Sequence, residues 1–282
     1  MNFDILAIDG DILAFRAAAA VQNVHINSFG YAEPFAHVNE GKVALDNMLY
    51  WLKTHIPANN VEVFLTDKTN FRREIDPEYK ANRKDSVRPL LLDTLKEHLR
   101  ENHGAYSEAG LEADDILSQA GTMPDAKVCL VGKDKDYLSI PGFYHKIGDR
   151  DYNGKPIIKE TAKWEAQRFH LMQTLAGDRV DGYFGCPGIG MERAARILDE
   201  SLELFPEEGV ITRGKNKGQK TTKWVGKPTD DPWRVVVSNY EKAGLGEADA
   251  LRNARLAYLL QYGEGTDYRW TPDRLKITSQ KD

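Results

Sequence analysis

Long apolar runs, cysteines and metal-binding histidine motifs are scarce in this sequence, and each scarcity excludes a class of protein. No apolar stretch approaches the roughly 20 residues that span a bilayer, and the start lacks the basic segment of a signal peptide. Two cysteines, Cys129 and Cys186, are too few for a disulfide framework, so we expect a protein of a reducing cytoplasm. The seven histidines show no H-E-x-x-H spacing, and no Gly-x-x-x-x-Gly-Lys-Ser/Thr loop occurs.

An excess of positive charge is also missing, since the net charge is −5. That value alone argues against a nucleic-acid partner, but the charges are unevenly distributed. Ten acids are clustered, and bound cations would neutralise part of their charge. Residues 213–227 hold six Lys or Arg and no acid. The clustered acids are Asp9, Asp11, Asp67, Glu112, Asp114, Asp115, Asp134, Asp136, Asp178 and Asp181.

Apolar runs alternate with amphipathic segments over the first half of the 282 residues. This alternation is typical of an α/β fold with a mostly parallel central sheet and flanking helices. From about residue 160 to 262 the pattern is mainly helical. We therefore predict an α/β domain over residues 1–175 and a helical region over 176–282. The predicted strands are 3–9, 61–67, 127–133 and 142–147, and the predicted helices include 42–55, 90–99 and one from 114 onward; residues 22–40 favour neither.

Carboxylates recur where the predicted strands end. Asp9, Asp67 and Asp134 each follow an apolar run, and the carboxyl ends of parallel strands are where open α/β sheets bind ligands. A single such acid is more often a helix N-cap. So many anions at one crevice would repel one another unless cations lay between them, and Mg²⁺ prefers oxygen ligands. The sequence therefore predicts a metal-dependent enzyme acting on phosphate esters.

Two further acidic clusters coincide with predicted helix starts. Glu112-Ala-Asp114-Asp115 precedes an apolar helical pattern, and Asp178 and Asp181 are spaced to share one helical face. Asp136, two residues after Asp134, would join the same site if the chain turns there. Together the clusters supply nine candidate metal ligands: Asp9, Asp67, Glu112, Asp114, Asp115, Asp134, Asp136, Asp178 and Asp181.

Residues 188–194 have the G-x-G-x-x-x-A form of a helix–hairpin–helix module. Glycines let the backbone approach a phosphate, and the amides that begin the next helix point toward it. Such a contact grips DNA without reading its sequence. An ordinary turn between helices would look the same, but the motif directly follows Asp178 and Asp181. We therefore name Gly188, Gly190 and Arg193 as candidate DNA-binding residues.

Two basic stretches are candidates for nucleic-acid contact. Residues 71–84 mix aromatic and cationic side chains, as single-strand binding surfaces do, although a solvated loop is the alternative. Residues 213–227 combine lysine with glycine, which is typical of an arm that contacts phosphates or of a surface loop. The candidates are Arg72, Arg73, Tyr79 and Lys84 in the first stretch and Lys215, Lys217 and Lys220 in the second.

Taken in order, these motifs resemble the 5′-nuclease superfamily of flap endonucleases and 5′→3′ exonucleases. The likeness covers roughly residues 3–225 and is greatest to the stand-alone 5′-exonucleases of short-tailed phages. It depends on the runs Ile8-Asp9-Gly10, Phe15-Arg16, Thr66-Asp67, Glu78-Tyr79-Lys80-Ala81-Asn82-Arg83, Glu112-Ala113-Asp114-Asp115, Asp134-Lys135-Asp136 and Gly177-Asp178-Arg179-Val180-Asp181.

The resemblance implies a role for each matched residue. Asp67, Glu112, Asp114 and Asp134 would hold a first Mg²⁺ or Mn²⁺, with Asp9 and Asp115 close by; Asp136, Asp178 and Asp181 would hold a second. Lys80 and Arg83, aided by Arg16, would approach the scissile phosphate from a helical arch or clamp at about 68–100. Tyr79 would stack on a base. Asp11 stands where Thr or Ser is commoner, so its role is open.

The implied activity is hydrolysis from 5′ ends or at 5′ flaps of duplex DNA, with RNA paired to DNA as a second substrate. The implied setting is a monomeric phage protein in the bacterial cytoplasm, with K⁺ at the hairpin and no membrane partner. Two alternatives remain. Asp9-Gly10-Asp11 also fits a haloacid-dehalogenase-type phosphatase, and a non-catalytic, structure-specific DNA-binding protein would hold a metal without cleaving.

Overall fold

The computed structural model describes residues 2–83 and 87–276, which form two compact units. Unit 1 comprises Met1–Phe71, Asp85–Ala166 and Leu259–Tyr268. Unit 2 comprises Arg72–Lys84, Gln167–Tyr258 and Arg269–Asp282. No helix in the described part of the chain has the length and apolar character needed to cross a membrane.

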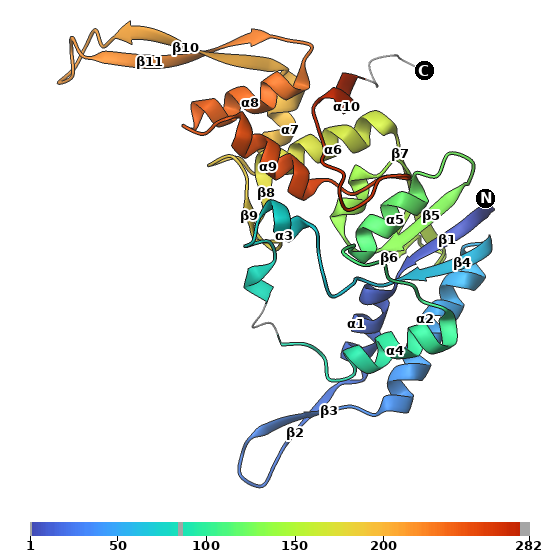
Figure 1. Cartoon of the computed structure of the whole chain (residues 1–282). Coiled ribbons are helices and arrows are strands. Elements are labelled where there is room, and N and C mark those ends of the chain that lie inside the picture. The colour runs from blue at the N-terminus through green and yellow to red at the C-terminus, as the bar shows by residue number, and fades with distance from the viewer. Residues whose placement is uncertain (1, 84–86, 277–282) are drawn as a thin grey trace. The chain divides into compact units, whose positions relative to one another are not determined.

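Unit 1 is built around a five-stranded sheet with the order β4-β1-β5-β6-β7 (Figure 1). The first three pairings in this order are parallel and the last, between β6 and β7, is antiparallel. The prediction of a mostly parallel α/β sheet is therefore confirmed, with an antiparallel edge strand that the sequence pattern did not indicate. The strands are β1 (Phe3–Asp9), β4 (Ala58–Phe64), β5 (Val128–Gly132), β6 (Gly142–Arg150) and β7 (Pro156–Thr161).

Helices cover both faces of this sheet (Figure 1). Side chains alternate between the faces of a strand. Leu6 and Ile8 of β1 accordingly join one buried cluster with α1 (Gly10–Val21), α2 (Val38–His55) and α4 (Leu92–His103). The intervening Ala7 faces the other side, where α5 (Ala113–Gly121) contacts β1, β4 and β5. The predicted helices 42–55 and 90–99 correspond to α2 and α4.

Unit 2 contains most of the remaining helices: α3 (Arg72–Ile75), α7 (Met191–Glu200), α8 (Pro232–Lys242), α9 (Glu247–Ala257), α10 (Asp273–Lys276) and the larger part of α6 (Lys163–Ala176). Buried hydrogen bonds join α6, α8 and α9. The Tyr240 hydroxyl donates to the Thr174 carbonyl oxygen at 2.6 Å and accepts from the Asn253 amide at 2.7 Å. The short strands β8 (Gly177–Asp178) and β9 (Tyr183–Phe184) pair antiparallel.

The expectation of mainly helical structure after residue 160 is wrong between α7 and α8. There, β10 (Leu202–Val210) and β11 (Lys220–Pro228) form a long antiparallel hairpin (Figure 1). Its strands include Phe205, Trp224 and Val225, and β-branched and aromatic residues favour a pleated surface. Gly214 and Gly218 adopt positive φ in the connecting turn. A second hairpin, β2 (Asn23–Ile26) and β3 (Ala32–Phe35), occupies the region without a prediction.

The segment 68–100, predicted as an arch, is not one continuous helix in its described residues. It contains α3, the 3-10 turn η1 (Ala81–Arg83) and most of α4. Residues 72–83 belong to unit 2, whereas α4 belongs to unit 1. Unit 2 also contains most of α6, whereas the sequence prediction placed this segment, up to residue 175, in the first domain. The assignment of catalytic and DNA-binding roles to the two regions stays a prediction.

Candidate active site

The carboxyl end of β1 is the topological switch point of the unit 1 sheet. The chain passes from β1 to β4 on one side and later returns to β5 on the other. Ligands bind at such points because the connections leave in opposite directions and open a crevice. Asp9, the last residue of β1, lies at this position and its Oδ1 caps α1 by accepting from the Ile12 amide at 3.1 Å.

A buried tyrosine joins Asp9 to a second acid. The hydroxyl of Tyr137 lies 3.1 Å from Asp9 Oδ2 and also contacts Asp114 Oδ1. One O–H carries a single proton, so it can donate to only one of these two carboxylates at a time. Gly132 makes this arrangement possible, because a Cβ there would lie 2.1 Å from the Tyr137 ring.

The electrostatics of this cluster would favour a bound cation. Burial, with a contribution from Asp11, raises the pKa of Asp9 to about 7. Burial and the charges of Asp114 and Asp9 also raise the pKa of Tyr137 well above its usual value. Desolvation and like charge both disfavour the ionised carboxylate, and a bound dication would reverse that preference.

Asp134 reaches the same neighbourhood from the end of β5. Its Oδ1 accepts from the Asp136 amide at 3.1 Å and so caps the 3-10 helix η2 (Lys135–Ser139). Its carbonyl oxygen accepts from the Tyr144 hydroxyl at 3.1 Å. Burial raises the pKa of Tyr144, and the charges of four acids add to the shift: Asp134, Asp149, Asp9 and Asp114. Tyr137 therefore links Asp9 and Asp114, and the charge of Asp134 acts on Tyr144 together with theirs.

The carboxylate of Asp67 is engaged by its own loop. It accepts from the Thr69 hydroxyl and amide and from the Gly110 amide. The hydrogen bond from the Thr69 hydroxyl, followed by the backbone ones, holds the pKa of Asp67 far below its usual range, so this carboxyl stays ionised. A second loop is thereby tied to the end of β4, and the predicted role of Asp67 as a metal ligand stays a prediction.

Glu112 and Asp115 are both buried at the start of α5. The Asp115 carboxylate accepts from the Glu112 amide at 3.3 Å and from the Leu260 amide, also at 3.3 Å. The first bond closes the first turn of α5, and the second ties residues 259–268 to it. Asp115 thus orients the turn that carries Asp114, whatever further role it has.

The contacts of Asp11 give this residue a structural role. Its Oδ1 lies 2.8 Å from Nζ of Lys96 on α4, and its Oδ2 accepts from the Thr66 amide at 3.1 Å. The residue therefore braces α1 against α4 and the end of β4. Arg16, one turn further along α1, is half-buried, with Gly148 nearby.

Asp178 and Asp181 belong to unit 2, whereas Asp136 belongs to unit 1. Asp178 is buried and accepts from the Val180 and Asp181 amides at 2.8 and 3.3 Å. Asp181 forms ion pairs with Arg83 and, at 3.5 Å, with Lys80. The predicted cations and one predicted metal ligand are thus partners. Joint metal binding by Asp136, Asp178 and Asp181 stays a prediction.

Two residues predicted to contact DNA are buried instead. Arg72 is 1% exposed, and its guanidinium donates to the carbonyl oxygens of Leu256 and Tyr258 at 3.0 and 2.6 Å. Tyr79 is 3% exposed, with its hydroxyl 3.2 Å from Asp181 Oδ2. Both anchor residues 72–83 within unit 2, which a charge pattern cannot reveal. Arg73, by contrast, is exposed.

The remaining predicted DNA-binding residues lie in turns and on the hairpin. Gly188 has φ +74 and accepts through its carbonyl from Arg193, and Gly190 is the N-cap of α7. Lys215 and Lys217 lie in the turn between β10 and β11, Lys220 begins β11, and all three are exposed. Lys84 lies outside the described residues.

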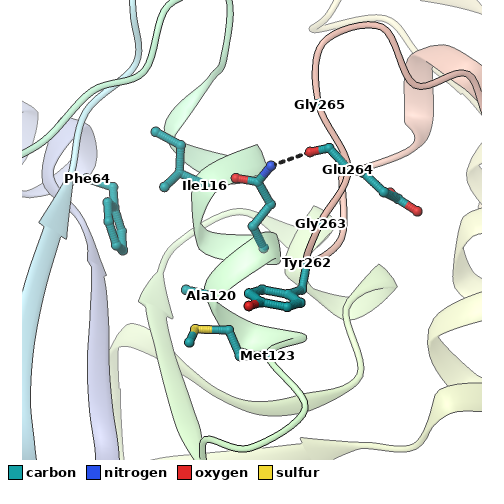
Figure 2. A pocket seen from close by; sticks show the side chains of 9 residues that line it. Phe64, Ile116, Ala120, Met123, Tyr262, Gly263, Glu264 and Gly265 are labelled. Atoms are coloured by element: carbon teal, nitrogen blue, oxygen red, sulfur yellow. Dashed lines mark hydrogen bonds between the residues drawn. The ribbon is translucent and has the colours of Figure 1, made fainter.

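Two cavities lie in unit 1. One, of about 550 Å³, is lined by Asp134, Tyr144 and the lysines 133, 135, 146 and 159. The other, of about 440 Å³, lies between α5, the end of β4 and the turn 262–265 (Figure 2). Its lining is largely apolar, and the side chains of Tyr262 and Met123 lie next to one another there (Figure 2). None of the predicted site residues lines this cavity.

Sequence reasoning missed Tyr137 and Gly132. Tyr137 follows the Asp134-Lys135-Asp136 run directly, but an aromatic residue at that spacing also fits a core position. Its partner Asp9 is 128 residues away in the chain, so only the folded sheet brings the hydroxyl to the carboxylate.

Comparisons with known proteins identify the family of this chain, whose mostly parallel sheet carries Asp9 at its switch point. The family model described as "5'-3' exonuclease, N-terminal resolvase-like domain" matches residues 4–154. The chain therefore belongs to the 5′-3′ exonuclease family, within the 5′-nuclease superfamily, and the resemblance seen in the sequence is confirmed. This family membership argues against the alternative of a haloacid-dehalogenase-type phosphatase.

Full-length relatives support the same assignment. The exodeoxyribonuclease of Enterobacteria phage T3 is 33% identical over 95% of this chain and 93% of its own length. The exonuclease of Escherichia phage T7 is 31% identical over 92% and 89%. Among solved structures, the T5 D15 protein co-crystallised with metal ions shares the fold, with a TM-score of 0.55 and 17% identity over 92% of this chain and 90% of that one.

Proposed function

We propose that this chain hydrolyses phosphodiester bonds at the 5′ ends and 5′ flaps of duplex DNA, using divalent metal ions bound by the carboxylates of unit 1. The observation that carries this proposal is that Asp9 and Asp114 share the Tyr137 hydroxyl at the carboxyl end of β1, where burial raises the pKa of Asp9 to about 7. Anions held this close fit a site made for cations.

The donors are all oxygens, which suits Mg²⁺ or Mn²⁺ rather than a softer ion. Asp9, Asp114 and Asp134 would hold the first metal, with Asp67, Glu112 and Asp115 supporting them; Asp136, Asp178 and Asp181 remain the candidates for a second. Bound dications would supply an activated water and offset charge on the leaving oxygen. Tyr137 would orient Asp9 and Asp114 by donating its hydroxyl proton to one of them.

Cations of the chain would bind the phosphate. Lys80 and Arg83 are paired with Asp181, so contact with DNA would require them to exchange that partner for a phosphate oxygen. Arg16 would assist from α1. The cavity beside Asp134 carries four lysines, 133, 135, 146 and 159, which makes its rim attractive to a nucleic-acid backbone.

Duplex DNA would be held by backbone contacts in unit 2. The Gly188–Gly190 turn precedes the N-terminus of α7, where amide groups favour an anion, and K⁺ would fit between such a turn and a phosphate. Arg73, Arg193 and the hairpin residues Lys215, Lys217 and Lys220 would add charge. We propose a monomer acting in bacterial cytoplasm during phage replication, where RNA paired to DNA at primers is a second substrate.

Cleavage of an internally labelled duplex and of a matched 5′-flap duplex tests this proposal. We expect Mg²⁺-dependent loss from 5′ ends that EDTA stops, with the ratio of the two rates separating exonuclease from flap activity. Binding of both substrates without cleavage in Mg²⁺ or Mn²⁺ would contradict the proposal and support a non-catalytic, structure-specific DNA-binding protein.

A further inference from the structure

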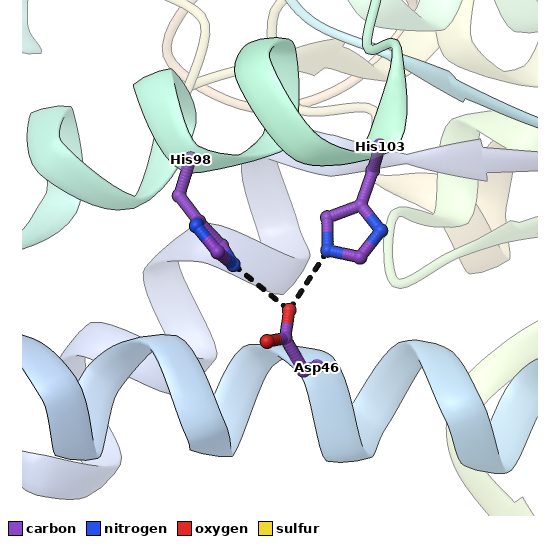
Figure 3. Close-up of side chains that lie close together, drawn as sticks. All are labelled: Asp46, His98 and His103. Carbon is purple, nitrogen blue, oxygen red and sulfur yellow. Dashed lines mark hydrogen bonds and ion pairs between the residues drawn. The ribbon is translucent and has the colours of Figure 1, made fainter.

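A second candidate metal site lies between α2 and α4, formed by residues that the sequence did not mark. Among the described residues, Asp46, His98 and His103 can each offer one ligand atom such that all three atoms lie within 4.8 Å of one another. Asp46 belongs to α2, and both histidines belong to α4 (Figure 3). The spacing of five residues between the histidines does not match a helical zinc motif, which explains why the pattern of the sequence did not reveal it.

The two imidazoles converge on one carboxylate oxygen. Nε2 of His98 lies 2.9 Å from Asp46 Oδ1, and Nε2 of His103 lies 2.8 Å from the same atom. The rings meet edge to face, with centroids 5.4 Å apart, so both nitrogens point into the same small volume (Figure 3). Such convergence is what a shared cation requires, whereas two separate hydrogen bonds do not need a common acceptor.

The donor set and its exposure suit a transition-metal dication. Two imidazole nitrogens and one carboxylate oxygen form a three-ligand set that Zn²⁺ accepts, at about 2.0–2.2 Å from each atom. Ligand atoms around such an ion lie about 3.3 Å apart, so Asp46 would retreat by a few tenths of an ångström. Its side chain is 45% exposed and free to do so, while those of His98 and His103 are 10% and 19% exposed. Water can reach the fourth position from the Asp46 side.

A neighbouring amide already positions one ring. Asn102 Nδ2 lies 3.0 Å from Nδ1 of His98, and also donates to the His98 carbonyl oxygen at 3.2 Å. In this form Nδ1 accepts, so Nε2 carries the proton that is donated to Asp46. A metal at Nε2 needs the other tautomer, with an acceptor facing Nδ1. Rotation of the Asn102 amide would present its oxygen there.

We propose that Asp46, His98 and His103 bind one Zn²⁺-class ion that joins α2 to α4, independently of the carboxylates at the end of β1. The ion would replace two hydrogen bonds by three coordinate bonds across the same pair of helices. α4 also carries Lys96, whose ammonium pairs with Asp11 at 2.8 Å. The proposed site would therefore stabilise the helix that braces the candidate active site.

The test is a metal titration of the whole protein, stripped with EDTA and then held in excess Mg²⁺ to occupy oxygen sites. We expect one equivalent of Zn²⁺ to bind and to raise the Tm by at least about 3 °C. Co²⁺ should give the visible absorption of a tetrahedral site, without a thiolate band because the proposed ligands, Asp46, His98 and His103, include no cysteine. Asp134→Ala should bind Zn²⁺ as the wild type does.

Variants of the proposed ligands and of the neighbouring Asn102 decide where the ion binds. His103→Gln and Asp46→Asn should lose the Zn²⁺-dependent rise in Tm, whereas His25→Gln, on the exposed strand β2, should keep it. Asn102→Asp would place a carboxylate against Nδ1 of His98 and should tighten Zn²⁺ binding about tenfold. Asn102→Asp keeps all three proposed ligands, so its result remains decisive if His103→Gln or Asp46→Asn folds poorly. A Zn²⁺ response that is absent, or equal in His103→Gln and wild type with no gain in Asn102→Asp, overturns the proposal.

Discussion

The hydroxyl oxygen of Tyr137 lies 3.1 Å from Oδ2 of Asp9, a residue 128 positions earlier in the chain. The same hydroxyl contacts Asp114. A neutral donor thus lies between two carboxylates that would otherwise face each other in a buried site. The candidate active site consequently has a positioning group besides the acids, and that group can be removed without changing the charge of the cluster.

Tyr137→Phe tests this positioning role. The change leaves the ring in place but removes the hydroxyl shared by Asp9 and Asp114, so we expect the free energy of unfolding in EDTA to fall by about 1–3 kcal/mol. The loss should be smaller in saturating Mg²⁺, because bound cations then compensate the carboxylates. Urea unfolding with and without Mg²⁺ measures both values. Equal losses in the two conditions would show that the hydroxyl stabilises the fold independently of bound metal, which would contradict the positioning role.

The stabilisation by Mg²⁺ should increase with pH. Burial first, and then the charge of Asp11, raise the pKa of Asp9 from 3.8 to about 7 in the metal-free fold. The protonated form is therefore favoured by folding, and its contribution is complete below pH 3.8 and lost as the pH rises through about 7. Because a metal replaces that proton, the difference in Tm between Mg²⁺ and EDTA should grow from pH 5 to 8. In Asp9→Asn this growth should be much reduced.

Arg72 and Arg73 should behave in opposite ways although they are adjacent. Arg72→Met leaves the carbonyl oxygens of Leu256 and Tyr258 without their buried donor, and should cost about 2–4 kcal/mol of stability. Arg73→Met changes an exposed side chain and should cost less than about 0.5 kcal/mol. If Arg73 contacts duplex DNA, its loss should reduce the slope of log Kd against log salt by about 0.9. Chemical denaturation and fluorescence anisotropy measure these effects, and the opposite pattern would refute the assignment.

Acid should destabilise unit 2 through His170. Its Nε2 lies 2.8 Å from the Ala254 carbonyl oxygen, and burial lowers its pKa from 6.5 to about 4. Neutral His170 therefore favours the folded state above pH 6.5, and this contribution is lost as the pH falls toward 4. Between pH 7 and 5 the loss amounts to about 2 kcal/mol. His170→Gln should flatten that part of the stability profile measured by urea unfolding, and an unchanged slope would exclude His170 as the cause.

Local patterns predicted the sheet, and the positions of most acids at strand ends and helix starts, because both depend on short stretches of chain. The alternation of β1 and the acids at strand ends are readable within a few residues. Asp9 and Asp114 accordingly share the Tyr137 hydroxyl at the carboxyl end of β1, where the strand order implied a site.

Long-range packing explains what could not be predicted. Arg72 resembles any exposed arginine until α9 and the residues after it cover it, more than 180 positions later in the chain. The β10–β11 hairpin was misread because short apolar runs fit helix and strand alike, and only cross-strand pairing decides between them. The convergence of His98 and His103 on Asp46 likewise depends on two helices packing together.

Asp134→Ala gives the most direct test of the central claim, that carboxylates at the switch point bind metal for hydrolysis. Cleavage of a 5′-flap duplex in Mg²⁺ should be followed under single-turnover conditions, with DNA binding measured separately by anisotropy in Ca²⁺. We predict that cleavage becomes undetectable while the Kd for DNA stays close to that of the wild type. Cleavage at a near wild-type rate would contradict the account.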